Sequence, residues 1–362
     1  MRPKLDSGAT WTRERRVVAF ACIVAAALVV WLVAHSGLRA VAPASGGNPT
    51  PTPTGIDDGV RGHGQLSVSG ARLVGQRGEP VQLRGVSSHG IHWYPEYGNA
   101  GALRTLRETG ANVFRVAMYS DGSGSYESHP EESYVEATSA VDNALAAGMY
   151  VIVDWHVLSE HNPNVHLEPA LAFFGRISAQ YAGQPGVIYE ICNEPNGPTT
   201  WQDIKTYANR VIPVIRANSP DAIILVGTPG YSTKITEAAR DPLDFKNVLL
   251  TFHYYADLSG GGYQDAIDNT LGKNVGVFVS EWGIGNDHSP ATDEVQRLLE
   301  KSRAFLDYLD GKGISWVSWS LSNKDEGSSL IRHDSRALSD WSDSELTTYG
   351  QFVFARLRTP VG

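Results

Sequence analysis

The chain has 362 residues, of which 42% are hydrophobic and 19% charged, so it is long and apolar enough to form a large folded domain. Its net charge is −9 overall, and residues 45–362 carry 24 basic and 37 acidic side chains. Binding to nucleic acid requires a basic face, so we expect no nucleic-acid partner. The only cysteines, Cys22 and Cys192, exclude a disulfide framework and a cysteine-based zinc site.

Residues 1–44 form a basic segment followed by an apolar run. Three arginines, Arg13, Arg15 and Arg16, precede residues 17–34, which are all apolar. A run of this length can be a membrane-spanning signal anchor or the core of a long signal peptide. The basic flank predicts that the amino terminus stays in the cytoplasm and that the rest is exported. We therefore expect a secreted protein, or an anchored one that touches the membrane only through this segment.

Residues 45–62 are predicted to be a linker, because proline and threonine alternate through PTPTPT. Such a sequence favours an extended spacer with nothing to bury. The folded domain is then predicted to cover residues 63–362 and to be a monomer. At its start, residues 65–83 have the pattern of a β-hairpin.

Short β-branched runs recur through this domain at regular intervals. They predict eight strands, at residues 81–87, 112–119, 150–156, 187–194, 223–227, 248–255, 277–283 and 314–320. Apolar residues at helical spacing lie between them, for example from Trp201 to Ile215 and from Val295 to Leu309. Gly110 and Gly148 stand where helices should end.

This alternation is typical of a (β/α)8 TIM barrel, here with the amino-terminal hairpin capping the barrel floor. The alternative is a doubly wound open sheet. That fold favours a glycine-rich turn after its first strand, and no such turn is found here.

In such barrels the chemistry takes place at the carboxyl ends of the strands. Two glutamates stand at such ends, Glu194 in Asn-Glu-Pro and Glu281 in Ser-Glu-Trp-Gly. A pair of carboxyl groups is what glycosidic-bond cleavage requires, one as acid and one to meet the developing oxocarbenium carbon. Aromatic rings, which stack on the apolar faces of sugars, occur at the same strand ends. The residues therefore indicate a glycosidase.

Other kinds of function remain open from the residues alone. His156, His161 and His166 recur every five residues, which fits no standard metal-ligand spacing, so we expect no metal and no cofactor. A serine hydrolase would carry G-x-S-x-G, which we do not find. The aromatic residues could also serve a non-catalytic sugar-binding barrel, although both carboxylates are present.

Seven segments together resemble glycoside hydrolase family 5, and within it the bacterial endoglucanases (cellulases) of Bacillus type. Asn-Glu-Pro and Ser-Glu-Trp-Gly are specific as a combination. The segments occur in the family order: GVSSHGIHWYPEY (85–97), VFRVAMY (113–119), VDWHVLSEHNPN (153–164), YEICNEPNG (189–197), FHYYA (252–256), VFVSEWG (277–283) and ISWVSWSLSNKDEGSS (314–329).

The resemblance implies a retaining endo-β-1,4-glucanase, with a role for each matching residue. Glu194 would be the acid/base and Glu281 the nucleophile. Asn193 would bind the sugar 2-hydroxyl, while Arg115 and Tyr255 would hydrogen-bond Glu281.

The resemblance also implies the residues that line the catalytic centre and grip the sugar chain. His156 would line the centre, and His253 would support the acid/base. The residues that would contact the sugar on the non-reducing, glycone side are His89, Trp93, Tyr94, Tyr119, Trp319, Lys324 and Glu326.

The sequence departs from the family in the loop after the fifth strand, where Tyr231 replaces the usual tryptophan. We expect Tyr231 to serve as a smaller platform on the opposite, aglycone side. No cellulose-binding module is recognised in the sequence, so we expect soluble or amorphous β-glucan as substrate. A β-mannanase, a β-1,3-glucanase or a mixed-linkage glucanase would use the same machinery.

Overall fold

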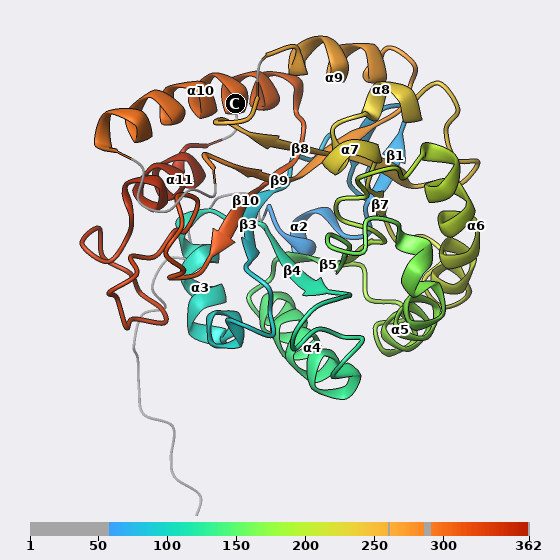
Figure 1. Ribbon diagram of the computed structural model, residues 1–362, viewed down its shortest axis with the longest axis horizontal. Coiled ribbons are helices and arrows are strands. Elements are labelled where there is room, and N and C mark those ends of the chain that lie inside the picture. The colour runs from blue at the N-terminus through green and yellow to red at the C-terminus, as the bar shows by residue number, and fades with distance from the viewer. Residues whose placement is uncertain (1–57, 260, 286–290, 361–362) are drawn as a thin grey trace, which may run out of the picture. The chain divides into compact units, whose positions relative to one another are not determined.

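The structure is a computed structural model that describes residues 58–259, 261–285 and 291–360. Within these ranges, eight parallel strands close into a barrel in the order β10-β3-β4-β5-β6-β7-β8-β9, and helices surround it (Figure 1). The barrel strands are β3 (Arg84–Ser88), β4 (Val113–Tyr119), β5 (Tyr150–His156), β6 (Val187–Glu190), β7 (Ile224–Val226), β8 (Val248–Tyr255), β9 (Val277–Gly283) and β10 (Trp316–Leu321). The predicted (β/α)8 barrel is confirmed.

Apart from α2, which precedes the barrel, the helices fall between and after these strands, as the alternating pattern predicted. They are α2 (Val60–His63), α3 (Ala100–Thr109), α4 (Pro130–Ala146), α5 (Leu167–Gln180), α6 (Trp201–Asn218), α7 (Pro229–Ser232), α8 (Ile235–Ala238), α9 (Tyr263–Leu271), α10 (Thr292–Lys312) and α11 (Thr348–Arg358), with 3-10 turns η1 (Pro95–Gly98) and η2 (Pro163–His166). Gly110 ends α3 with a φ of 110°, which suits glycine because it has no Cβ.

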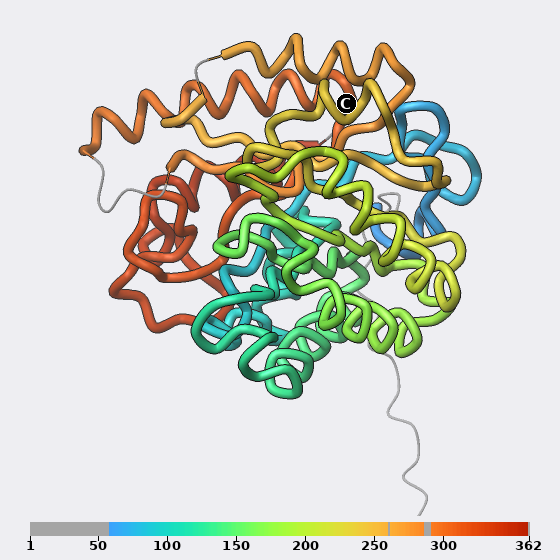
Figure 2. Tube along the Cα trace, turned by 45° about the vertical axis from the view of Figure 1, so that its right-hand side comes forward, coloured from blue at the N-terminus to red at the C-terminus, as the bar shows by residue number. Residues whose placement is uncertain are grey.

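The predicted hairpin consists of β1 (Ser67–Ser69) and β2 (Arg72–Val74), which pair antiparallel and are coloured blue in Figure 2. Leu66 and Leu73 from this region pack against residues of the barrel interior such as Val113 and Phe278. These interior residues lie toward the amino ends of their strands. The hairpin therefore closes the barrel floor, at the end opposite the strand carboxyl termini.

Two predicted strands, those at residues 81–87 and 187–194, differ most at their ends from the observed ones, and β4, β7 and β10 differ by one or two residues. β3 begins at Arg84 rather than at residue 81, because the chain from Val81 to Leu83 packs into the floor. β6 ends at Glu190, so Glu194 lies in the loop beyond the strand and not on it. Backbone hydrogen bonds continue past the end of the strand and hold this loop: the Ile191 N–H donates to the Leu225 carbonyl, and the Asn193 N–H donates to the Trp155 carbonyl.

The predicted apolar segment at residues 17–34 lies outside the described residues, as does most of the predicted linker. The linker's last residues are described and touch the barrel body. The Val60 N–H donates to the Gly148 carbonyl at 3.1 Å, and Asp58 pairs with Arg107 at 2.6 Å. In the part of the chain that the structure describes, no helix has the length and apolar character needed to cross a membrane.

Candidate active site

Alternation along the strands gives the barrel interior an apolar half and a charged half. Residues at every second position of a barrel strand face inward. On β4 the first inward residue, Val113, belongs to the apolar floor, and the next is Arg115. On β5, Ile152 of the floor is followed by Asp154 and then His156. The inward positions nearer the carboxyl ends therefore bring polar side chains together inside the barrel.

An irregularity in β9 places two consecutive residues of that strand in this interior. Thr251 pairs with Phe278, but His253 pairs with Glu281, so β9 has one more residue than β8 over this stretch. The register against β10 shifts in the same way. A β-bulge of this kind re-aims side chains, and such bulges are common beside active sites. Here both Ser280 and Glu281 face the polar interior.

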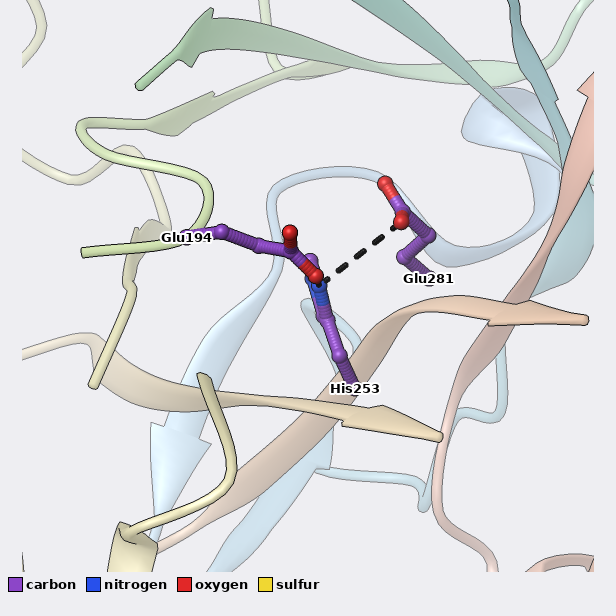
Figure 3. Close-up of side chains that lie close together, drawn as sticks. All are labelled: Glu194, His253 and Glu281. Carbon is purple, nitrogen blue, oxygen red and sulfur yellow. Dashed lines mark hydrogen bonds and ion pairs between the residues drawn. The ribbon is translucent and has the colours of Figure 1, made fainter. Parts of the chain in front are cut away.

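Glu194 is held by the backbone of its loop and by one histidine. Its N–H donates to the Val157 carbonyl at 3.1 Å, which ties the loop to the chain just after β5. Its Oε1 lies 2.8 Å from Nδ1 of His253 on β8 (Figure 3). His253 thus contacts Glu194, the residue that it is predicted to support.

Glu281 receives two hydrogen bonds from groups that keep their protons. The Tyr255 hydroxyl donates to Oε1 at 2.8 Å, and Arg115 Nη1 donates to Oε2 at 3.0 Å. The Nδ1 of His253 also lies 3.9 Å from the same Oε1, and Figure 3 marks this contact with a dashed line that ends on Glu281. Both of the predicted partners of Glu281, Arg115 and Tyr255, therefore contact it.

Arg115 is fully buried and binds more carboxylates than the sequence predicted. Its Nε donates to Glu190 at 2.7 Å, and its Nη2 lies 2.9 Å from Asp154. Burial disfavours the charge on Arg115, but Asp154, Glu190 and Glu281 raise its pKa, so it remains a cation. Glu190 and Asp154 were not assigned roles from the sequence. Their only signal was an acidic residue inside an otherwise apolar strand.

Asn193 and His156 are joined to this network and to each other. Arg115 Nη2 donates to Asn193 Oδ1 at 2.6 Å, which leaves the Asn193 amide nitrogen pointing toward His156 Nε2 at 3.2 Å. His156 Nδ1 lies 2.6 Å from Asp154. Asn193 itself is fully buried. It is therefore held by Arg115 beside Glu194 but is not among the residues that line the cleft, so its binding of the sugar 2-hydroxyl stays a prediction.

A cleft of about 770 Å³ opens over the two glutamates. On one side it is lined by His89, Trp319, Lys324 and Glu326, residues predicted to contact the sugar. Lys324 Nζ lies 2.7 Å from Glu326, and the Trp319 indole N–H donates to the same carboxylate at 3.3 Å. Glu326 thus fixes both the ring and the cation on this side of the cleft.

Of the remaining predicted aromatic residues, Tyr119 lines the cleft, and Trp93 and Tyr94 contact a residue that does. Tyr119 lines the cleft and contacts His156, with ring centroids 4.1 Å apart. Trp93 and Tyr94 do not line it, but their rings contact that of His89. Trp93 is 44% exposed, so its ring is open to a ligand at the rim.

Tyr231 lines the opposite side of the cleft and is 51% exposed. It has a φ of 62° and follows Gly230 at 67°, so the loop turns sharply there. The Tyr231 N–H donates to the Pro195 carbonyl at 3.1 Å, which fixes the loop against the Glu194 segment. Leu258 and Tyr263, which the sequence analysis did not single out, line the cleft beyond it.

Burial raises the pKa of both central glutamates. The pKa of Glu194 is raised to about 8, although Arg115 partly opposes the shift. The pKa of Glu281 is raised to about 7, with His253, Arg115 and the Tyr255 hydroxyl all opposing it. Because Glu281 accepts hydrogen bonds from Tyr255 and Arg115, it is the first of the pair to ionise. The arrangement therefore provides an acid beside a carboxylate.

Among the described residues, one group of side chains is spaced closely enough to hold a metal ion. It consists of Glu194, His253 and Glu281, which each offer one potential ligand atom within 4.8 Å of the others. Their facing atoms already hydrogen-bond one another, Tyr255 and Arg115. The three histidines of the five-residue repeat form no such group in the described part of the chain, since His161 contacts Asn196 and His166 lies near Asp121.

Comparison with known proteins identifies the family. Residues 74–325 match the family described as cellulase, glycosyl hydrolase family 5. An endoglucanase of Clostridium saccharobutylicum is 42% identical over 292 residues, which are 80% of this chain and 64% of that protein. Endoglucanase N of Pectobacterium atrosepticum is 41% identical over 301 residues, 83% of this chain and 66% of that protein.

A solved structure agrees with these relatives. It is a variant of the catalytic domain of Thermobifida fusca endoglucanase Cel5A in complex with cellotetraose, with a TM-score of 0.76 and 32% identity, covering 84% of this chain and all of that domain. The chain spans slightly less than two thirds of the length of the two curated relatives. Because the family match covers more than half of the chain, the chain belongs to glycosyl hydrolase family 5, the cellulase family.

Proposed function

We propose that the protein is an endo-β-1,4-glucanase that hydrolyses internal bonds of soluble or amorphous cellulose-like β-glucans with net retention. The observation that carries this proposal is the short distance between the two carboxyl groups, whose nearest oxygens lie within 4.8 Å. Retaining glycosidases hold their carboxyl groups about 5–5.5 Å apart, whereas inverting ones leave about 6.5–9.5 Å for a water molecule. The separation of Glu194 and Glu281 supports retention.

In the first step, a carboxylate oxygen of Glu281 bonds to the anomeric carbon while the bond to the leaving sugar breaks. Glu194 gives its proton to the leaving oxygen at the same time, so the departing sugar leaves as a neutral alcohol. The raised pKa of Glu194 supports this role, because burial keeps its proton at neutral pH. Arg115 and Tyr255 would aim Glu281 and hold its negative charge.

In the second step, a water molecule attacks the anomeric carbon of the glycosyl-enzyme. Glu194, now ionised, takes a proton from that water, and the bond to Glu281 breaks. The two inversions give net retention of configuration. Glu194 ends the cycle protonated and Glu281 ends it ionised, as both began.

The cleft supports the choice of an internal bond in a polymer. It extends from His89 and Trp319 on one side of Glu194 to Tyr231 and Tyr263 on the other. Rings on both sides of the reacting bond can stack on successive sugars. A chain can therefore lie across the two glutamates with sugar units bound on both sides of the cut.

We further propose that the catalytic body acts outside the cytoplasm. The basic residues that precede the apolar run at residues 17–34 support export. A proline- and threonine-rich stretch after that run would separate the enzyme from a membrane if the run is retained. The small residues Ala42-Pro43-Ala44 form a cleavage pattern ahead of Ser45, and peptide sequencing of the mature amino terminus distinguishes cleavage there from an uncleaved anchor.

Viscosity loss and reducing-end release, measured in parallel on carboxymethylcellulose, mannan and mixed-linkage β-glucan, test the activity. An endo-glucanase lowers viscosity early, after few bonds have been cut. We expect this on carboxymethylcellulose and not on mannan. A preference for mannan would contradict the substrate, and the absence of cleavage on all three substrates by folded protein would contradict the activity.

A further inference from the structure

A line of hydrogen bonds runs from Glu194 into the barrel interior, beyond the groups assigned to the reaction. Glu194 Oε1 contacts His253 Nδ1 at 2.8 Å, and His253 Nε2 contacts Ser280 Oγ at 3.1 Å. The Ser280 hydroxyl in turn donates to Glu190 Oε1 at 2.6 Å. His253 is 3% exposed, and Ser280 and Glu190 are fully buried, so no solvent competes for these contacts.

Glu190 fixes the direction of these hydrogen bonds. It forms a buried ion pair with Arg115 at 2.7 Å, and an ionised carboxylate only accepts hydrogen bonds. A serine hydroxyl carries a single proton, which Ser280 gives to Glu190. Toward His253, Ser280 can then only accept. The proton of this contact must therefore belong to His253 Nε2.

The tautomer of His253 decides what Glu194 must do. Burial lowers the pKa of His253 to about 4, so its ring is neutral at neutral pH. A neutral imidazole that donates through Nε2 has a bare Nδ1, which only accepts. The proton between Nδ1 and Glu194 Oε1 must then come from the carboxyl group. This hydrogen bond forms with the acid form of Glu194 and stabilises it.

We propose that Ser280 and Glu190 are positioning residues that hold His253 in the Nε2–H tautomer, so that its Nδ1 accepts a hydrogen bond from the protonated carboxyl group of Glu194. The inference rests on the proposed function, because it explains how the acid of that mechanism keeps its proton between turnovers. Neither residue lines the cleft. Ser280 acts on Glu194 through His253, and Glu190, which also binds Arg115, acts on His253 through Ser280. The β9 bulge brings Ser280 into reach while Glu281, its neighbour in sequence, faces the substrate.

Other titratable groups surround Glu194 and His253 and also influence the pKa values of these two residues. They are Tyr119 and Arg115 on β4, Asp154 and His156 on β5, Glu190 on β6, Tyr255 on β8 and Glu281 on β9. Replacing Ser280 removes no charge from this set. An effect of Ser280→Ala on the pH profile therefore reports the hydrogen bond and not a lost charge.

The first test is the pH dependence of kcat/KM for Ser280→Ala. Without its acceptor, His253 Nε2–H is unpaired, and the Nδ1–H tautomer, which donates to ionised Glu194, becomes favoured. This lowers the pKa of Glu194, so the alkaline limb should move to lower pH by about one unit. Ser280→Thr keeps the hydroxyl and should restore the limb.

Thr251→Val is the matched control. Thr251 donates to the same oxygen, Glu190 Oε1, at 3.0 Å, and it is as deeply buried as Ser280. None of its hydrogen bonds goes to His253. Its replacement should leave the alkaline limb in place. Equal shifts for Ser280→Ala and Thr251→Val would overturn the proposal, since both would then act only through Glu190.

The second test reads the tautomer without using activity. In the full chain labelled with ¹⁵N-histidine, long-range proton–nitrogen correlations distinguish the two tautomers, and His253→Asn identifies the signal. We expect Nε2–H in the wild type and Nδ1–H in Ser280→Ala. A wild-type signal for Nδ1–H would overturn the inference even if the variants fail to fold. If Glu194→Gln retained the alkaline limb while the tautomer was as expected, the proposed function would fail instead.

Discussion

Glu194 and Glu281 lie in the same cleft, but their neighbours hold them in different protonation states. Glu281 accepts hydrogen bonds from Tyr255 and Arg115, both of which favour its ionised form. Glu194 faces a buried, neutral histidine, and burial raises its pKa to about 8. One carboxyl group is thereby suited to protonating an oxygen and the other to attacking a carbon.

Replacement of Glu194 by glutamine removes the acid without changing the size of the side chain. Turnover of carboxymethylcellulose should fall by roughly 10²–10⁴-fold, the usual contribution of a general acid. Formation of the glycosyl-enzyme from an aryl cellobioside with an activated leaving group should fall far less, because such a group departs without a proton. The burst of released phenol measures this step. Equal losses on both substrates would show that Glu194 is not the acid.

The pH dependence of kcat/KM follows from the same two groups. In the proposed mechanism the active form has Glu281 ionised and Glu194 protonated, so activity should fall as pH drops below about 7 and as it rises above about 8. A narrow optimum between these values is expected. Glu194→Gln should lose the alkaline limb and keep the acid limb. Persistence of both limbs in that variant would contradict the assignment.

Among single residues, those that belong to a sequence motif could be predicted, whereas those whose role depends on contacts in the folded structure could not. Asn-Glu-Pro and Ser-Glu-Trp-Gly carried enough pattern to pick out Glu194 and Glu281. Glu190 carried no such signal, because its role depends on reaching Arg115 from another strand. Conversely, the motif singled out Trp93 as a sugar-contacting residue, but in the structure its ring contacts His89 and does not line the cleft.

The elements were predicted where hydrophobic periodicity is strong and less well where the chain departs from regular structure. Helix α6 and strands β5, β8 and β9 fall where their patterns placed them. β6 stops short of Glu194 because the loop that carries this residue bonds to the chain after β5 instead. The bulge in β9 could not be predicted either, since it appears only in the pairing with β8 and β10.

The hairpin β1–β2 closes the floor and lies far along the strands from the catalytic ends. Leu73 is 7% exposed and packs in the floor cluster with residues such as Leu249. Leu73→Ala should lower the free energy of unfolding by about 2–4 kcal/mol, because it leaves a cavity there. The value of kcat per folded molecule should not change. Urea denaturation and initial rates check both, and a large fall in kcat would show that the floor is coupled to the site.

Over the whole molecule, the charged barrel interior costs stability. The pKa of Glu194 is raised from its usual 4.5 to about 8 in the folded protein. A folded protein that holds this proton more tightly than the unfolded chain loses stability as pH rises through that window. The buried His253, whose pKa is lowered, acts in the opposite sense below about pH 6.5. The two groups thus act in opposite directions: Glu194 lowers stability as pH rises toward 8, and His253 lowers it as pH falls below about 6.5.

Glu194→Gln isolates one of these groups. Its free energy of unfolding relative to the wild type should rise between pH 4.5 and 8, the window of the raised pKa. The gain at pH 8 should be on the order of 1 kcal/mol or more, since one pKa unit corresponds to about 1.4 kcal/mol. Thermal unfolding midpoints of both proteins across this range measure the difference. A constant difference would show that Glu194 titrates alike in the folded and unfolded chains.

The central claim is that Glu281 forms a covalent bond to a β-1,4-linked glucosyl unit, and trapping that bond tests it most directly. An activated 2-deoxy-2-fluoro cellobioside slows hydrolysis of the intermediate, so the glycosyl-enzyme should accumulate and can be mapped by peptide mass spectrometry. We expect one added cellobiosyl unit on the peptide with Glu281 and none in Glu281→Gln. A label on another carboxylate, or turnover with inversion and no label, would contradict the account.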